Sequence, residues 1–146
     1  MSPCDRLHHA QRSLSMIAVR GSVLLVDDEV MFASSLRRLF ASEHDVTVIT
    51  KGRDVLDAIR GGARFDVIVC DLMMPELSGA ELHTQLVRIA PDQAARMIFL
   101  TGGAYSPSSQ AFLDSIPNTW FEKPCNLDQL REAVRRAVAI SSRSRM

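Results

Sequence analysis

The sequence predicts an α/β fold in which five parallel strands form a doubly wound sheet in the order 2-1-3-4-5. Short apolar runs rich in β-branched residues alternate with longer stretches whose apolar residues recur at helical spacing, which is typical of βαβ units. Acidic residues also follow the first and third runs, where a doubly wound sheet binds its ligands. The expected strands are residues 22–26, 45–50, 65–70, 96–101 and 118–121.

The segments between these runs have the periodicity of amphipathic helices. Phe32, Leu36, Leu39 and Phe40 fall at i, i+4, i+7 and i+8, on one face of the first helix. Similar faces follow the other strands, which gives a (βα)₅ pattern. Three helix starts carry capping signals, namely Ser78 with Glu81, Asn126 with Gln129, and Ser106 before Pro107.

One domain is expected over residues 21–140, because 146 residues with 47% hydrophobic composition fit a single core. Residues 1–20 are expected to be an extension that is either disordered or an extra helix, since Leu7, Ala10, Leu14 and Ile17 share one face. Residues 141–146 are polar and are expected to form a frayed tail.

Composition excludes some classes of function. The formal net charge is +0, from 17 basic and 17 acidic residues, so no overall field favours nucleic acid or an anionic membrane. The arginines between residues 131 and 145 are interpreted as a solvated helix face rather than a nucleic-acid site. Cys4, Cys70 and Cys125 lack the spacing of a zinc or disulfide framework. No apolar run is long enough for a membrane span, so a cytoplasmic location is expected.

The candidate site lies at the carboxyl ends of the strands. Asp27 and Asp28 close the first strand and Asp71 closes the third, so three carboxylates are expected to converge in the crevice between them. A hard cation would relieve their repulsion, and Mg²⁺ suits one or two carboxylates with bridging phosphate oxygens. Thr101 and Lys123 end the fourth and fifth strands and would hold a phosphoryl oxygen.

This set of residues predicts phosphoryl transfer to the protein itself. Asp71 would attack phosphorus in line as a carboxylate nucleophile, while the metal and Lys123 neutralise the equatorial charge. The product would be an acyl phosphate on Asp71.

Four strings identify a family that the sequence resembles. They are LLVDDE (residues 24–29), DLMMPELSGAEL (71–82), FLTGG (99–103) and FEKP (121–124), and their order and spacing are similar to those of bacterial response-regulator receiver domains. The resemblance covers residues 21–140 and implies a flavodoxin-like fold that acts in a two-component or phosphorelay pathway.

The resemblance also implies residue roles. Asp71 would be the phosphoacceptor, and Asp28, Asp71 and the backbone carbonyl of Met73 would bind Mg²⁺ directly, with Asp27 helping through water. Thr101 would contact the phosphoryl group.

Lys123 would contact the same group, and a cis peptide bond to Pro124 would aim its ammonium into the site. Gly79 and Gly102 match small residues of the family. Trp120 stands where the family usually has Tyr or Phe as a rotameric switch, and Cys125 replaces an aromatic residue, so switching through Trp120 and partner choice are in question.

Implied partners are a histidine kinase or a histidine phosphotransfer protein, and a downstream protein that meets the fourth helix, fifth strand and fifth helix.

Slow self-dephosphorylation is expected, because neither Met73 nor Gly103 can position a hydrolytic water. Two other functions stay open: a phosphorylation-independent receiver-fold binding module, and a small hydrolase that uses an aspartyl phosphate. The hydrolase lacks a second acid two residues after Asp71.

Each site residue also has a purely structural interpretation. Asp27 and Asp28 could cap the first helix, and Asp71 could be a turn residue. Thr101 could simply end a strand, Lys123 could be a solvated surface charge, and Trp120 could serve packing alone.

Overall fold

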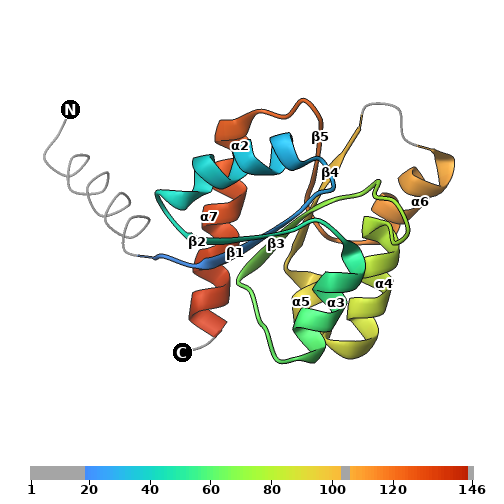
Figure 1. Ribbon diagram of the computed structural model, residues 1–146, viewed down its shortest axis with the longest axis horizontal. Helices are drawn as coiled ribbons and strands as arrows, with labels where there is room; N and C mark the ends of the chain where they lie inside the picture. Colours follow the sequence, from blue (N-terminus) through green and yellow to red (C-terminus); the bar gives the residue numbers. More distant parts are fainter. Residues whose placement is uncertain (1–18, 103–105, 145–146) are drawn as a thin grey trace, which may run out of the picture.

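A computed structural model describes residues 19–102 and 106–144 of the chain (Figure 1). Its sheet has five parallel strands in the order β2-β1-β3-β4-β5, which confirms the predicted topology. In that order β1 and β3 are neighbours although a strand and two helices separate them in sequence. The strands are β1 (Ser22–Val26), β2 (Asp45–Ile49), β3 (Val67–Asp71), β4 (Met97–Thr101) and β5 (Trp120–Glu122).

Helices cover both faces of the sheet (Figure 1). Leu24 and Val26 of β1 point into a core formed with α3, α4, α5 and α6, whereas Val23 and Leu25 point into a core formed with α2 and α7. Burial on both faces explains the nearly unbroken apolar runs of the central strands. The helices are α2 (Val30–Ala41), α3 (Gly52–Arg60), α4 (Gly79–Ile89), α5 (Pro91–Ala95), α6 (Pro107–Ser115) and α7 (Leu127–Ser144).

The predicted caps are present at three helix starts. The Ser78 side chain accepts a hydrogen bond from the Glu81 amide while the Glu81 carboxylate accepts one from the Ser78 amide, a complete capping box at α4. Ser106 accepts from the Ser109 amide at the start of α6. The Asn126 side chain accepts from the amides of Asp128 and Gln129 at the start of α7.

Strands β2 to β5 each differ from their predicted ranges by one or two residues at an end, and one helix was not predicted. Strand β3 begins at Val67, because the two residues before it are engaged by side-chain hydrogen bonds. The Phe65 amide and carbonyl form hydrogen bonds with the buried side chain of Gln93. The Asp66 carboxylate accepts a hydrogen bond from the Ser22 amide. The short helix α5, which begins at Pro91, was not predicted because five residues are too few to show a period.

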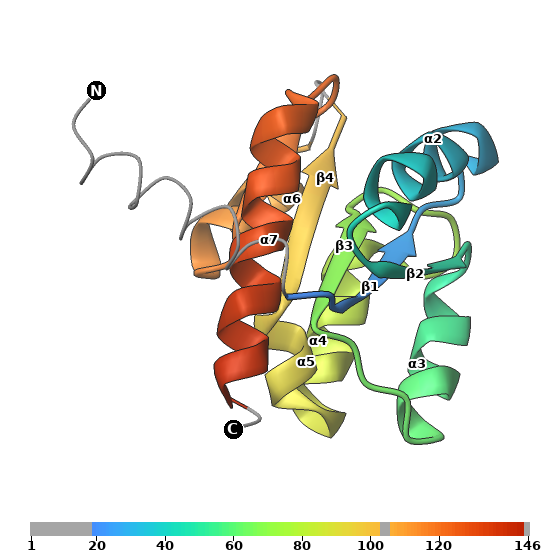
Figure 2. The ribbon, with the colours of Figure 1, turned by 90° about the vertical axis from the view of Figure 1, so that its left-hand side faces the viewer.

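The expected tail at residues 141–144 is wrong. Helix α7 continues to Ser144, and it stands beside the sheet in Figure 2. Ser141 is 2% exposed and its hydroxyl donates a 2.6 Å hydrogen bond to Asp66 Oδ1. Its partner is 75 residues away in sequence, so local polarity could not reveal the contact.

The N-terminal boundary also shifts slightly. Val19 packs on the core shared with α7, and Arg20 makes a 3.0 Å ion pair with Asp45, so these two residues belong to the fold. The expectations for residues 1–18 and 145–146 lie outside the described residues.

Candidate functional site

Three carboxylates meet at the carboxyl edge of the sheet, as the sequence predicts. Asp27 follows β1 directly and Asp71 is the last residue of the neighbouring β3. One oxygen from each of Asp27, Asp28 and Asp71 lies within 4.8 Å of the others. Asp27 and Asp71 are 3% and 6% exposed, whereas Asp28 is open to solvent.

Both oxygens of Asp27 are already engaged. Oδ1 accepts a 2.8 Å hydrogen bond from the Glu29 amide, and Oδ2 accepts one of 3.0 Å from Lys123 Nζ. Glu29 is the N-cap residue of α2, and its side chain makes no capping hydrogen bond. Asp27 therefore shapes the turn between β1 and α2 and also anchors the lysine, so helix capping alone does not describe its role.

The Lys123 ammonium lies between the two buried acids. Its Nζ is 3.7 Å from Asp71 Oδ2, and it also lies 4.2 Å from the centre of the Phe32 ring. Burial disfavours the ammonium, but the hydrogen bond that Lys123 donates to Asp27 and the charge of Asp71 outweigh burial and raise the pKa of Lys123. The peptide bond to Pro124 is cis, as expected. Lys123 is thus not a solvated surface charge.

The Asp71 carboxyl is held in an unfavourable environment for its charge. Burial is the largest cause and the charge of Asp27 the second, and together they raise the pKa of Asp71 to about 6 despite the opposing charge of Lys123. The Met73 amide donates to Asp71 Oδ1 over 3.4 Å. A cation beside this carboxylate would relieve the repulsion.

Thr101 ends β4 one residue beyond Leu100, the register partner of Asp71. Its side chain is fully buried, and among the described residues its Oγ1 has no hydrogen-bond partner. A buried hydroxyl without a partner is costly. Its backbone carbonyl accepts a 2.6 Å hydrogen bond from the Lys123 amide, so the hydroxyl and the ammonium come from directly linked strand ends.

Met73 extends the site toward α6. Its side chain is 56% exposed, and the Ser109 hydroxyl in the first turn of α6 donates to its sulfur at 3.7 Å. Gly79 allows the loop to close, because a Cβ there would lie 2.6 Å from the Asp71 carbonyl oxygen.

Trp120 begins β5 opposite Phe99 and is half-buried against the core cluster that includes Leu113 of α6. The contact between Lys123 and Phe32 was not predicted, because periodicity assigned Phe32 only to a core face.

The donor set fits a hard divalent cation. Three carboxylates with oxygens within 4.8 Å supply the oxygen ligands that Mg²⁺ prefers, and the unpartnered Thr101 hydroxyl and the Lys123 ammonium fit phosphoryl oxygens. Fold and site together define a class: a doubly wound α/β protein with an acidic, lysine-containing pocket at its topological switch point.

The family model of the response regulator receiver domain matches residues 23–135. The chain belongs to the response regulator receiver domain family, whose members are signalling modules rather than enzymes. The predicted family and fold are confirmed.

Known relatives are similar to this chain over a part of their length. The hydrogenase transcriptional regulatory protein HoxA of Bradyrhizobium diazoefficiens is 30% identical over 125 residues, which are 85% of this chain and 25% of that protein. The transcriptional regulatory protein YkoG of Bacillus subtilis is 30% identical over 120 residues, 82% of this chain and 51% of that protein. The chain thus spans a quarter to a half of these relatives.

A solved receiver-domain structure is similar in fold to this chain. The receiver domain of Francisella response regulator 1452 has a TM-score of 0.69 at 27% identity, covering 82% of this chain and 97% of that one. Among the described residues, no helix has the length and apolar character needed to cross a bilayer.

Proposed function

We propose that this receiver domain accepts a phosphoryl group on Asp71 in a Mg²⁺-dependent reaction and passes the signal on by changing the surface that it offers to a protein partner. One observation carries the proposal: Asp71 lies 3.7 Å from the Lys123 ammonium and in a cluster with two further carboxylates, one oxygen of each lying within 4.8 Å of the others. These are the groups that an in-line transfer to a carboxylate needs.

The chemistry is a displacement at phosphorus. An Asp71 carboxylate oxygen forms the new O–P bond while the bond from phosphorus to the donor atom breaks, and the donor keeps that electron pair. Lys123 is placed to neutralise charge on the equatorial oxygens, and the Thr101 hydroxyl can donate to one of them. The acyl phosphate on Asp71 is the product.

Asp28, Asp71 and the Met73 carbonyl would hold the ion directly, and Asp27 would contact it through water. When bound, Mg²⁺ supplies positive charge that offsets the charge of the carboxylates and the phosphoryl oxygens. Asp27 keeps its hydrogen bond to Lys123 in this arrangement, which orients the ammonium.

A phosphohistidine on a histidine kinase or a phosphotransfer protein is the proposed donor. The family assignment supports this donor, as does the 27% identity over 111 residues to hybrid signal transduction histidine kinase H of Dictyostelium discoideum.

The two described cysteines, Cys70 and Cys125, are both free thiols, which supports a cytoplasmic location.

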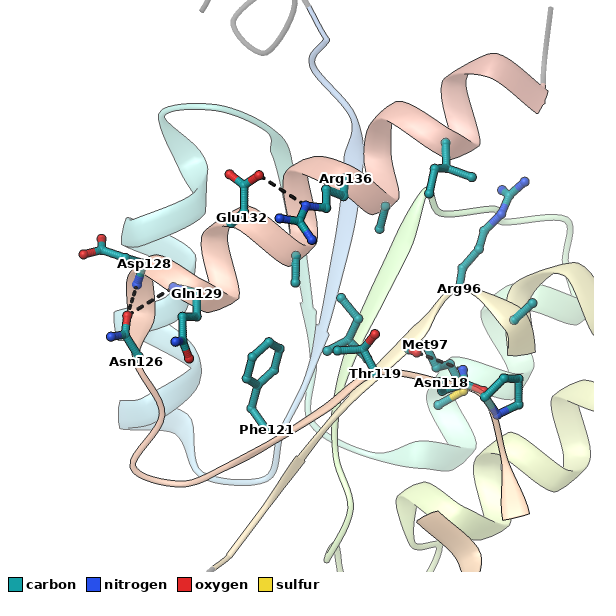
Figure 3. Close-up of a pocket in the computed structure, with 16 residues that line it drawn as sticks. Arg96, Met97, Asn118, Thr119, Phe121, Asn126, Asp128, Gln129, Glu132 and Arg136 are labelled. Carbon is teal, nitrogen blue, oxygen red and sulfur yellow. Dashed lines mark hydrogen bonds and ion pairs between the residues drawn. The ribbon is translucent and has the colours of Figure 1, made fainter. Parts of the chain in front are cut away.

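The proposed output surface is formed by α6, β5 and α7. Thr101 drawn toward a phosphoryl group would move the segment that leads from β4 to α6, and Trp120 packs against the core cluster to which Leu113 of α6 belongs. A groove of about 710 Å³ opens beside β5, with Phe121 on its floor and Glu132 and Arg136 of α7 on its wall (Figure 3). A downstream protein could contact this groove without covering the phosphoacceptor pocket.

The proposed lifetime of the acyl phosphate is long. Met73 and Gly103 carry no group that can orient a hydrolytic water, so self-dephosphorylation should take minutes or more. Decay within seconds would contradict this expectation.

The direct test is intact mass after incubation with Mg²⁺ and acetyl phosphate. One added phosphoryl group is expected for the wild type and none for Asp71→Asn or after chelation of Mg²⁺. The same stoichiometry in Asp71→Asn would contradict the proposal. No incorporation by folded wild type with bound Mg²⁺ would instead favour the phosphorylation-independent binding module.

A further inference from the structure

Phe32 lies in the first turn of α2, close to the phosphoacceptor pocket. Its neighbours Val30 and Met31 are 65% and 85% exposed, whereas the Phe32 ring is half-buried against the core that α2 shares with α7. The turn between β1 and α2, braced by the hydrogen bond from the Glu29 amide to Asp27, sets the direction of this first helical turn. The ring therefore lies beside the same loop that supplies the acids.

The Phe32 ring forms one wall around the Lys123 ammonium. The ammonium lies 4.2 Å from the ring centre, 3.0 Å from Asp27 Oδ2 and 3.7 Å from Asp71 Oδ2. The Lys123 side chain is only 18% exposed. An ammonium over an aromatic face is attracted by the negative potential of the ring, and the attraction grows as water is excluded.

We propose that Phe32 is a positioning residue for phosphoryl transfer, because its ring face holds the Lys123 ammonium between Asp27 and Asp71. A lysine side chain is flexible and strongly hydrated, so two carboxylates alone restrict the ammonium incompletely. The Phe32 ring, whose centre is 4.2 Å from the ammonium, is a further contact that restricts it. The kinetic part of this inference rests on the proposed function, whereas the contact between ring and ammonium can be tested without it.

A branched aliphatic side chain would not replace the ring. Leucine fills a similar volume and keeps the packing on the core, but it has no negative face to attract the ammonium. Without that attraction the ammonium is expected to spend more time in water and less time where a phosphoryl oxygen would form. Tyrosine keeps the ring face and should keep the position of the ammonium.

The first test is spectroscopic and needs no phosphorylation. The chain contains only two lysines, Lys51 and Lys123, so protein made with ¹³C-labelled lysine gives two Hε/Cε signals in an NMR spectrum. Protons above an aromatic face are shifted upfield by the ring current. We expect an upfield Lys123 signal in the wild type and in Phe32→Tyr, and a signal near that of the exposed Lys51 in Phe32→Leu.

The second test is kinetic. With Mg²⁺ and acetyl phosphate, Phe32→Leu should be phosphorylated about threefold to tenfold more slowly at saturating donor, which is the range that a partly buried cation–π contact provides. Half-saturation by the donor should change little, because the ring does not contact it. Phe32→Tyr should stay within about twofold of the wild type.

The matched control is Leu39→Val, a loss of packing on the same face of α2 but away from the lysine. It should lower the unfolding temperature about as much as Phe32→Leu without slowing phosphorylation. Equal rates for Phe32→Leu and the wild type, or equal slowing by Leu39→Val, would overturn the inference. So would a Lys123 signal in the wild type that coincides with that of Lys51. A wild type that takes up no phosphoryl group would overturn the proposed function instead, and the NMR comparison would still decide on the contact.

Discussion

The Asp71 carboxylate lowers the stability of the fold that positions it. Its pKa is about 6 because burial and the charge of Asp27 disfavour the ionised form. When the pKa of a carboxyl is higher in the folded state than in the unfolded state, the folded protein becomes less stable as the pH rises through the interval between the two pKa values. The destabilisation is therefore complete at pH 7, when no cation is bound.

Replacing Asp71 by Asn should therefore stabilise the metal-free protein. At pH 7 we expect the unfolding temperature to rise by about 3 to 8 °C, since raising the pKa of Asp71 to about 6 costs at most about 3 kcal/mol. Circular dichroism during heating in the presence of a chelator would measure it. Added Mg²⁺ should raise the unfolding temperature of the wild type more than that of Asp71→Asn, and equal responses would argue against a metal site at Asp71.

Gly79 lets the phosphoacceptor loop close onto α4. An added Cβ would lie 2.6 Å from the Asp71 carbonyl oxygen and 2.9 Å from Leu72 Cα, and these backbone atoms cannot move without displacing Asp71. Gly79→Ala should cost about 1–3 kcal/mol in a urea titration and slow phosphorylation. Gly61→Ala is the control, because its nearest atoms lie 3.3 Å away. Equal losses in both variants would contradict this reasoning.

Between elements, an ion-pair cluster ties the turn after α2 to α7. Glu43 accepts hydrogen bonds of 2.7 and 2.6 Å from Arg135 and a further one from Arg131. The hydrogen bond from Arg135 is the main reason that the pKa of Glu43 falls to about 2, while burial acts in the opposite direction. Because α7 also forms one wall of the groove that we propose as the output surface, this cluster helps to fix that wall.

The Glu43 cluster predicts a specific dependence of stability on pH. A carboxyl whose pKa is lowered on folding contributes stability above its unfolded value, and that contribution disappears as the pH falls toward the folded value. The wild type should therefore lose stability relative to Glu43→Gln between about pH 5 and pH 2. Denaturant titrations across this range would show it. Asp45→Asn, which removes an exposed ion pair with Arg20, should have little effect, and parallel curves for wild type and Glu43→Gln would contradict the prediction.

The last turn of α7 is held by a buried hydrogen bond. Ser141→Ala should cost about 1–2 kcal/mol in a denaturant titration, because it removes the 2.6 Å bond to the buried Asp66 Oδ1. Ser144→Ala, at an exposed position of the same turn, is the matched control and should have almost no effect. Equal changes in the free energy of unfolding for the two variants would mean that the Ser141 hydrogen bond makes no net contribution to stability.

At the scale of the whole molecule, the acid cluster and the groove that we propose as the output surface lie at different parts of the sheet. The acids lie at the carboxyl edge of β1 and β3, whereas the groove lies beside β5 and α7. Thr101 and Lys123 connect them, because their backbones are joined by a hydrogen bond at the end of β4. A change at Asp71 can thus reach β5 through directly bonded strand ends.

Trp120 is the single tryptophan and reports on this connection. Phosphorylation should change its fluorescence emission, with the same time course as the gain in mass, if the ring moves beneath α6. Asp71→Asn should show no change under the same conditions. Unchanged emission in fully phosphorylated wild type would mean that Trp120 serves packing alone.

The sequence by itself determined the (βα)₅ fold, the strand order and the acids of the pocket. The (βα)₅ pattern and the acids follow from local periodicity and from strand ends, whereas the strand order is the flavodoxin-like order that the resemblance to receiver domains implies. Parallel strands bring their carboxyl ends to one edge whatever their distance in the chain. Tertiary structure alone decided the contacts that join distant segments: Phe32 with Lys123, Met73 with Ser109, and Ser141 with Asp66. Side-chain direction and burial determine such pairs, and neither has a signature in composition or period. For the same reason Ser141 looked like part of a tail and Phe32 looked like an ordinary core residue.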